Sequence, residues 1–163
     1  MIRVGVLTVS DMGPRGLRAD TSGEAIREAL PRLDGREARY AIIPDERERI
    51  ALTLREWADS GEVDLILTTG GTGLGPRDVT PEATRDVLER EAPGLGEAMR
   101  ADTLRKTPFA MISRQVAGAR GRCLIVNLPG SPKAVRECLE VVLPVLPHAV
   151  ELLRGKTDSH PTA

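Results

Sequence analysis

One segment near the middle of the chain joins an apolar run, a cluster of glycines and the start of a helical pattern. The apolar run covers Val63 to Leu67, and four of the six positions from Gly70 to Gly75 are glycine. Pro81 then opens a pattern typical of a helix. The glycines allow backbone N–H groups to approach an anionic ligand, and the start of the helix adds partial positive charge. This strand, loop and helix therefore favour a phosphate-type binding site.

The same loop carries two charged residues directly after the glycines. Arg77 offers a fixed cation, and Asp78 is an acid of the kind that ligates metals. The alternative is a tight strand–helix turn that needs glycine only for its geometry. A plain turn rarely requires four glycines beside an Arg-Asp pair. Ligand binding is therefore the interpretation that the sequence favours.

Apolar and amphipathic patterns alternate along the rest of the chain. This alternation predicts a three-layer α/β/α domain with a mostly parallel sheet over residues 1–154, followed by a polar, loose tail, 155–163. Asp45 is the expected N-cap of its helix, and Thr80 caps the helix that begins at Pro81. Strands are expected at 2–9, 38–43, 63–68, 115–122 and 123–128, and helices at 22–30, 46–58, 81–89, 95–103, 130–143 and 145–153, with a short segment at 109–112.

Composition and charge exclude several kinds of partner. The formal net charge is −1, and the aromatic residues are only Tyr40, Trp57 and Phe109, so neither nucleic acid nor a membrane surface is an expected partner. The apolar N-terminal run is too short for a signal peptide, and no run approaches the roughly 20 residues of a membrane helix. Cys123 and Cys138 lack metal or redox spacing and are expected to be buried and reduced. A cytoplasmic protein is expected.

Polar residues follow the ends of four predicted strands. They are Ser10-Asp11, Pro44-Asp45, the loop from Gly70 to Gly75, and Asn127 to Ser131. In open α/β sheets, ligands bind beyond the carboxyl ends of the strands, near a reversal of strand order. The four loops are therefore expected to meet at one site.

Spacing excludes two common phosphate loops. No Gly-Lys-Ser/Thr follows the glycines, and Pro76 stands where a dinucleotide fingerprint needs its third glycine. The chain instead resembles the molybdopterin-binding family of molybdenum-cofactor biosynthesis, whose signature is this loop followed by Arg-Asp-Val-Thr-Pro, here Arg77 to Pro81. The resemblance extends from about residue 2 to about residue 154. It includes Ser10-Asp11, Asp20–Gly23, Pro44–Glu46, Pro93–Arg100, Ser113–Gln115 and Asn127–Pro132.

The resemblance implies which residues carry the chemistry. Asp45 and Asp78 would be catalytic and would hold Mg²⁺ on ATP, since Mg²⁺ prefers one or two carboxylates together with phosphate oxygens. The alternative for Asp45 is a purely structural N-cap, and Lys133 and Arg114 are open to surface or ion-pair roles. The expected substrate- and phosphate-binding residues are Ser10, Asp11, Gly70, Gly71, Thr72, Gly73, Arg77, Ser113, Asn127, Gly130, Ser131 and Lys133.

The resemblance also implies an activity and an assembly. The terminal phosphate of molybdopterin would attack the α-phosphorus of ATP, giving adenylylated molybdopterin and pyrophosphate. A homotrimer or a hexamer is implied, with hand-over of the product to a molybdate-insertion enzyme. The alternatives are a non-catalytic molybdopterin-binding paralogue or scaffold, and the molybdate-insertion enzyme itself, whose further domains the 163 residues do not contain.

Overall fold

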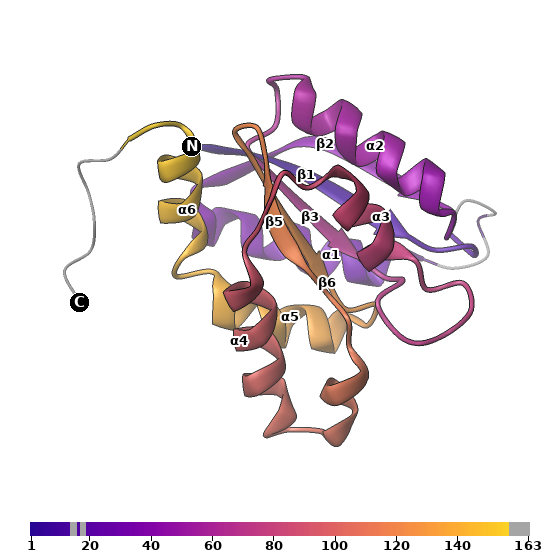
Figure 1. The fold of residues 1–163 in the computed structure, drawn as a ribbon. Helices are drawn as coiled ribbons and strands as arrows, with labels where there is room; N and C mark the ends of the chain where they lie inside the picture. Colours follow the sequence, from indigo (N-terminus) through magenta and orange to yellow (C-terminus); the bar gives the residue numbers. More distant parts are fainter. Residues whose placement is uncertain (14–15, 17–18, 157–163) are drawn as a thin grey trace.

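A six-stranded sheet forms the centre of the molecule. The structure, a computed structural model, describes residues 1–13, 16 and 19–156. The strand order is β2-β1-β3-β6-β5-β4 (Figure 1). β1, β3 and β6 pair in parallel, as do β1 and β2, whereas β5 runs antiparallel to both β6 and β4. The strands are β1 (Ile2–Val9), β2 (Gly35–Ile43), β3 (Leu65–Thr69), β4 (Arg90–Glu91), β5 (Ala117–Arg120) and β6 (Cys123–Leu128).

Helices cover both faces of this sheet, so the expected three-layer, mostly parallel α/β architecture is confirmed (Figure 1). One face carries α1 (Thr21–Ala29), α4 (Pro93–Leu104), α5 (Pro132–Val142) and α6 (Leu146–Leu153). The other face carries α2 (Arg47–Asp59) and α3 (Thr80–Val87). Two short 3₁₀ helices, η1 (Leu30–Leu33) and η2 (Pro108–Ile112), complete the described elements.

The alternation of side chains along the central strands builds two hydrophobic cores. In β3, Leu65 and Leu67 pack toward α1 and α5, while Ile66 packs toward α2 and α3. Successive side chains of a strand point to opposite faces, so a strand covered on both sides is apolar throughout. This requirement explains the consecutive apolar residues Leu65, Ile66 and Leu67 that open β3.

The strand order reverses beside β1. The chain leaves β1 for β2 on one side, and then returns to β3 on the other side. The loops after β1 and β3 therefore separate in opposite directions and leave a crevice beyond the carboxyl ends of these strands, which is the usual ligand position in such sheets.

The opposite end of the sheet is fastened by a buried carboxylate. Asp64 precedes β3 and its side chain is 5% exposed. It accepts hydrogen bonds from the Arg3 backbone and guanidinium and from Arg154 Nη2 at 2.6 Å. Arg154 follows α6 and also donates to the Met1 carbonyl at 3.4 Å. The first strand and the last helix thus meet at one acid.

Several element boundaries differ from the sequence expectations. β2 begins at Gly35 rather than at residue 38, and β4 was not expected. Glu46, not Asp45, occupies the N-cap of α2, and Thr80 is the first residue of α3 rather than its cap. Both cap predictions were wrong because these side chains bond to neighbouring loops instead.

Within the described residues, no helix combines the length and apolar character needed to cross a bilayer. Most of the expected tail, 157–163, lies outside the described residues.

Candidate active site

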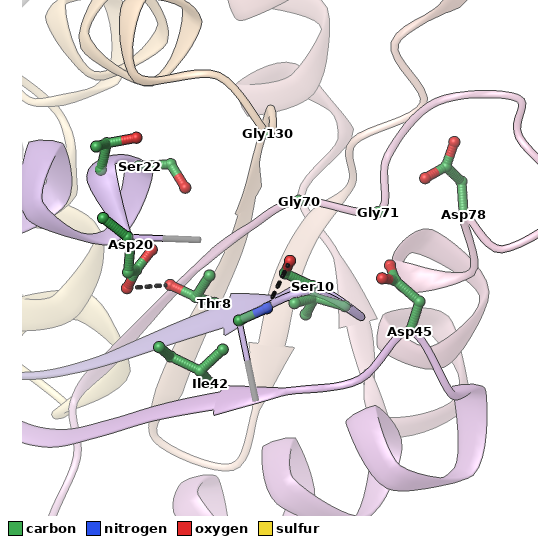
Figure 2. Close-up of a pocket in the computed structure, with 14 residues that line it drawn as sticks. Thr8, Ser10, Asp20, Ser22, Ile42, Asp45, Gly70, Gly71, Asp78 and Gly130 are labelled. Atoms are coloured by element: carbon green, nitrogen blue, oxygen red, sulfur yellow. Dashed lines mark hydrogen bonds between the residues drawn. The ribbon is translucent and has the colours of Figure 1, made fainter. Parts of the chain in front are cut away.

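A pocket of about 230 Å³ lies at the reversal of strand order (Figure 2). The ends of β1, β2 and β3, the start of α1 and the turn before α5 all contribute to it. Figure 2 shows Asp45 and Asp78 on one side of the pocket, with Asp20 and Ser22 on the other. The lining residues are Thr8, Val9, Ser10, Gly13, Ala19, Asp20, Thr21, Ser22, Ile42, Asp45, Gly70, Gly71, Asp78 and Gly130.

The backbone at Gly70 and Gly71 cannot accept side chains. Their φ angles are 96° and 68°, in the left-handed region that favours glycine. A Cβ on Gly70 would overlap the Val9 carbonyl oxygen, and a Cβ on Gly71 would overlap Thr80 Oγ1. The main chain of the loop therefore lies directly on β1 and on the start of α3. The N–H groups of Gly71, Thr72 and Gly73 donate to no acceptor in the described part of the chain.

The start of α1 forms the opposite wall, and its residues were not among the expected site residues. Asp20 caps α1 by accepting from the Gly23 N–H at 2.9 Å. Its other oxygen accepts from the Thr8 hydroxyl at 2.8 Å and the Tyr40 hydroxyl at 2.6 Å. Partial burial and the hydrogen bond to Asp20 raise the pKa of Tyr40 to about 12. The hydroxyl therefore stays protonated as a donor at neutral pH.

A sequence signal for this wall was present. Asp20 is followed by small polar residues and a glycine, directly before an amphipathic helix. Such a capped helix start after a strand exposes N–H groups and partial positive charge to the crevice. Thr8, Thr21 and Ser22 complete the wall.

Asp11 and Asp45 hold the loops after β1 and β2 together. The Asp11 N–H donates to Asp45 Oδ2, and the Asp45 N–H donates to Asp11 Oδ1, each at 3.0 Å. Burial and the negative charges of Asp11 and Asp78 raise the pKa of Asp45, although the Asp11 N–H and Arg77 act in the opposite direction. Asp45 Oδ1 has no hydrogen-bond partner among the described residues. It is available to a ligand.

Arg77 extends from the glycine-rich loop to Asp11. Its guanidinium makes a bidentate contact, with Nε 3.0 Å and Nη2 2.9 Å from the two carboxylate oxygens. The Arg77 side chain is 59% exposed. The loops after β1, β2 and β3 are thus linked in series through Arg77, Asp11 and Asp45.

Asp78 fits against the glycines of its own loop. Its Oδ2 accepts from the Gly75 N–H at 2.8 Å. A Cβ on Gly73 or Gly75 would stand 2.9 or 2.8 Å from that oxygen, closer than real Cβ contacts. These two glycines therefore make room for the carboxylate of Asp78. Asp78 Oδ1 has no partner in the described part of the chain.

The remaining expected site residues lie at differing distances from the pocket. Gly130 lines it, and Ser10 lies at its floor with Oγ accepting from the Met12 and Gly13 N–H groups at 3.3 Å. Ser131 is the N-cap of α5, and its hydroxyl accepts from the Ala134 N–H at 3.2 Å. Lys133 is exposed in the first turn of α5.

Two expected ligand contacts are placed elsewhere. Asn127 is fully buried within β6: its carboxamide donates to Thr68 and Thr84 and accepts from the Val116 N–H. Both amide hydrogens of Asn127 are therefore bonded inside the fold, so its side chain offers no donor to a phosphate in this arrangement. The Ser113 hydroxyl donates to Gln115 and lines a separate apolar hollow beside η2.

The fold and the site together define an α/β protein whose crevice beyond the strand ends holds backbone N–H groups beside two carboxylates, Asp45 and Asp78. Residues 5–148 match the family described as a probable molybdopterin binding domain, and the chain belongs to this family. It is 47% identical to a molybdopterin adenylyltransferase of Helicobacter pylori, over 94% of this chain and 89% of that protein. Identity to the molybdopterin adenylyltransferase of Escherichia coli K12 is 40%, over 94% and 86% of the two chains.

A solved structure agrees with this assignment. The crystal structure of a molybdopterin biosynthesis enzyme from Thermus thermophilus superposes with a TM-score of 0.90. The two chains are 62% identical, and the match covers 96% of this chain and 98% of the other. The family resemblance expected from the glycine-rich loop is confirmed.

Proposed function

We infer that this chain is a molybdopterin adenylyltransferase, which transfers AMP from ATP to the terminal phosphate of molybdopterin. The observation that carries the inference is the pocket at the strand-order reversal. There the glycine-rich loop, whose N–H groups at Gly71, Thr72 and Gly73 have no described acceptor, lies next to Asp45 and Asp78. The two relatives named molybdopterin adenylyltransferase support it over nearly the whole chain. ATP and molybdopterin are then the substrates.

The reaction exchanges one phosphorus–oxygen bond for another. An oxygen of the terminal phosphate of molybdopterin bonds to the α-phosphorus of ATP, while the bond from that phosphorus to the oxygen bridging to the β-phosphorus breaks. Pyrophosphate leaves with the electron pair. Little covalent chemistry is asked of the protein, so its contribution is orientation and charge stabilisation. The loop N–H groups at Gly71, Thr72 and Gly73 serve this role.

The start of α1, with Thr21 and Ser22, and the turn at Gly130 and Ser131 supply further donors for phosphate. Lys133 adds a positive charge near that turn. Ser10 and Asp11 border the loop after β1, where Asp11 orients Arg77. For Arg77 to contact a substrate phosphate, it must exchange its bond to Asp11.

Asp45 and Asp78 are proposed to hold Mg²⁺ with ATP. Each keeps one carboxylate oxygen without a described partner, and burial together with the negative charges of Asp11 and Asp78 already raises the pKa of Asp45. Hard oxygen donors of this kind suit Mg²⁺. The described residues form no group of three or more metal-ligating side chains, so substrate phosphate oxygens and water would supply the other ligands. The ion would offset the negative charge of the phosphates.

A homotrimer or hexamer is proposed as the working assembly. Its support is an apolar surface on and beside η2, where Phe109 is 75%, Met111 68% and Ile112 49% exposed. Contiguous exposed apolar surface of this kind marks interaction sites. The reaction consumes ATP, so we propose that it takes place in the cytoplasm. Its product contains no molybdenum, so a molybdate-insertion enzyme is the proposed recipient.

Omission of single components tests the proposed function. Pyrophosphate release is measured with molybdopterin, MgATP and protein, and then with each left out. Release should require all three, and adenylylated molybdopterin should appear in equal amount. Release without molybdopterin would indicate a simple ATPase, whereas molybdopterin binding without release would indicate a binding protein.

A further inference from the structure

Arg114 holds the glycine-rich loop from outside the pocket. It lies between η2 and β5, far from the loop in sequence. Its N–H donates to the Thr72 carbonyl at 2.8 Å, its Nε to the Gly73 carbonyl at 2.7 Å, and its Nη2 to the Asp78 carbonyl at 2.8 Å. One residue therefore fixes three carbonyl groups of the segment that carries the free donors and Asp78.

These contacts determine where the loop N–H groups point. In a trans peptide, the N–H of one residue points opposite to the carbonyl of the residue before it. Because the Thr72 and Gly73 carbonyls point toward Arg114, the N–H groups of Gly73 and Leu74 point away from it. The Gly70 and Gly71 carbonyls are taken by Thr80, through its hydroxyl and its N–H. The N–H groups of Gly71 and Thr72 are turned away in the same manner. Arg114 and Thr80 together thus fix the orientation of four consecutive N–H groups, those of residues 71–74.

Glu82 fixes the guanidinium in turn. Its Oε1 accepts from Arg114 Nη1, and the two side chains are 33% and 29% exposed. Partial burial works to raise the pKa of Glu82, but the hydrogen bond and positive charge of Arg114, together with the backbone N–H of Glu82 and the charge of Arg47, outweigh it and leave the pKa below the ordinary value. Glu82 therefore stays ionised at neutral pH. It stands in the first turn of α3, where a negative charge is favourable.

We propose that Arg114 is a positioning residue for adenylyl transfer. It sets the direction of the loop donors and the place of Asp78 without touching the substrates itself, and Glu82 orients it. The proposal rests on the proposed function for its kinetic consequence, but not for its structural one. A lysine cannot replace it, because a single ammonium lacks the planar fork that reaches carbonyls in separate directions.

The test compares Arg114→Ala, Arg114→Lys and Glu82→Gln with Arg120→Ala as the matched control. Arg120 also pairs with an acid, Asp59, and donates to a carbonyl, that of Val87, but it lies away from the pocket. Single-turnover transfer should fall about 10- to 100-fold in Arg114→Ala and Arg114→Lys. Molybdopterin affinity should change only a few-fold, and Arg120→Ala should transfer at the normal rate. Glu82→Gln should show a smaller loss in the same direction.

Two further measurements separate positioning from loss of fold. Millimolar guanidinium chloride, far below denaturing concentrations, should restore part of the rate to Arg114→Ala and none to Arg114→Lys. Hydrogen–deuterium exchange over residues 71–78 should accelerate in Arg114→Ala and remain normal in Arg120→Ala. Hydrogen–deuterium exchange needs no substrate, so it tests whether Arg114 holds the glycine-rich loop even if the protein transfers no adenylyl group. A normal transfer rate in Arg114→Ala, or unchanged exchange over 71–78 in both alanine variants, would overturn the proposal.

Discussion

Asp11 and Asp45 each accept a hydrogen bond from the other's backbone N–H at 3.0 Å, so two negative charges are held side by side at the edge of the pocket. The arrangement joins two loops, but it places like charges close together and contributes to the raised pKa of Asp45. Two carboxylates held this close are stabilised when a cation binds beside them or when one of the two loses its negative charge.

Asp45→Asn should therefore stabilise the free protein while it removes the activity. For a carboxyl whose folded-state pKa is raised, stability falls as pH rises from the unfolded pKa through the folded one, and the penalty is complete above it. The amide keeps an acceptor for the Asp11 N–H and ends the repulsion. We expect a gain of about 0.5 kcal/mol at pH 7, or roughly 1–2 °C in Tm. Calorimetry at pH 7 and pH 4 measures this; a clear loss at pH 7 would contradict it.

Asp78→Asn should affect the reaction more than binding. The substitution keeps the acceptor for the Gly75 N–H but removes the charge proposed to hold Mg²⁺. Transfer should fall by about 100-fold or more, while molybdopterin affinity stays within a few-fold. Equilibrium titration beside single-turnover kinetics separates the two effects. Near-normal turnover would remove Asp78 from the catalytic residues.

In the double variant Asp45→Asn/Asp78→Asn, the loss of transfer rate should be less than the sum of the two single losses in free energy, since both acids would serve one ion.

Gly71→Ala and Gly61→Ala separate backbone strain from steric overlap. Both glycines have positive φ, 68° and 72°, but a Cβ on Gly61 meets nothing within 4 Å whereas one on Gly71 overlaps Thr80 Oγ1. Gly61→Ala should cost about 1–2 kcal/mol from conformation alone and leave transfer intact. Gly71→Ala should cost more and also abolish transfer. Urea unfolding and transfer assays on both variants decide this. Equal losses in the free energy of unfolding would show that the overlap between the new Cβ at position 71 and Thr80 is relieved at no energetic cost.

Removing the buried acid at the far end of the sheet should weaken the fold strongly. Burial opposes ionisation of Asp64, but the bonds from Arg3 and Arg154 outweigh it and hold its pKa well below the ordinary range. Such a group stabilises the fold above its unfolded pKa of about 3.9, and the contribution is lost as pH falls below that value. Asp64→Asn should cost about 3 kcal/mol at pH 7, with the difference from wild type shrinking toward pH 2. A pH-independent difference would argue against an electrostatic origin.

Phe109→Glu tests the proposed assembly. A charge on this side chain, which is 75% exposed, would have to be buried in any interface formed by the apolar surface beside η2. The variant should shift to lower mass in light scattering coupled to gel filtration, with its melting curve otherwise preserved. Arg36→Glu, an exposed position on β2, serves as control. An unchanged mass for Phe109→Glu would place the interface elsewhere.

The sequence predicted the layers and most elements because their patterns are set by burial on two faces. β3 is an example, since a central parallel strand is covered on both faces and its residues Leu65 to Leu67 are all apolar. β4 escaped prediction because Arg90 and Glu91 are exposed edge residues with no apolar pattern. The first residues of β2 also lie at an exposed edge of the sheet, so their sequence likewise lacks the apolar pattern that predicts a strand.

For the site, strand ends located the pocket, but residue roles depended on contacts that no local pattern records. Asn127 stands one residue inside β6, where its amide is enclosed by Thr68, Thr84 and Val116. Asp45 reaches across to another loop instead of capping its own helix. Arg114 lies 36 residues from Asp78, so the bond between them follows only from the fold.

The meeting of Arg3 and Arg154 at Asp64 brings the two ends of the described fold together, on the side away from the glycine-rich loop (Figure 1). Because the backbone of Met1 is within hydrogen-bonding reach of Arg154, a short linker between these ends would nearly close the chain into a ring. A new opening in an exposed turn such as that at Gly121 would then leave every wall of the pocket in place. Chain order is thus separable from the geometry of the pocket, which depends on how the strands and loops assemble rather than on the order in which the polypeptide connects them.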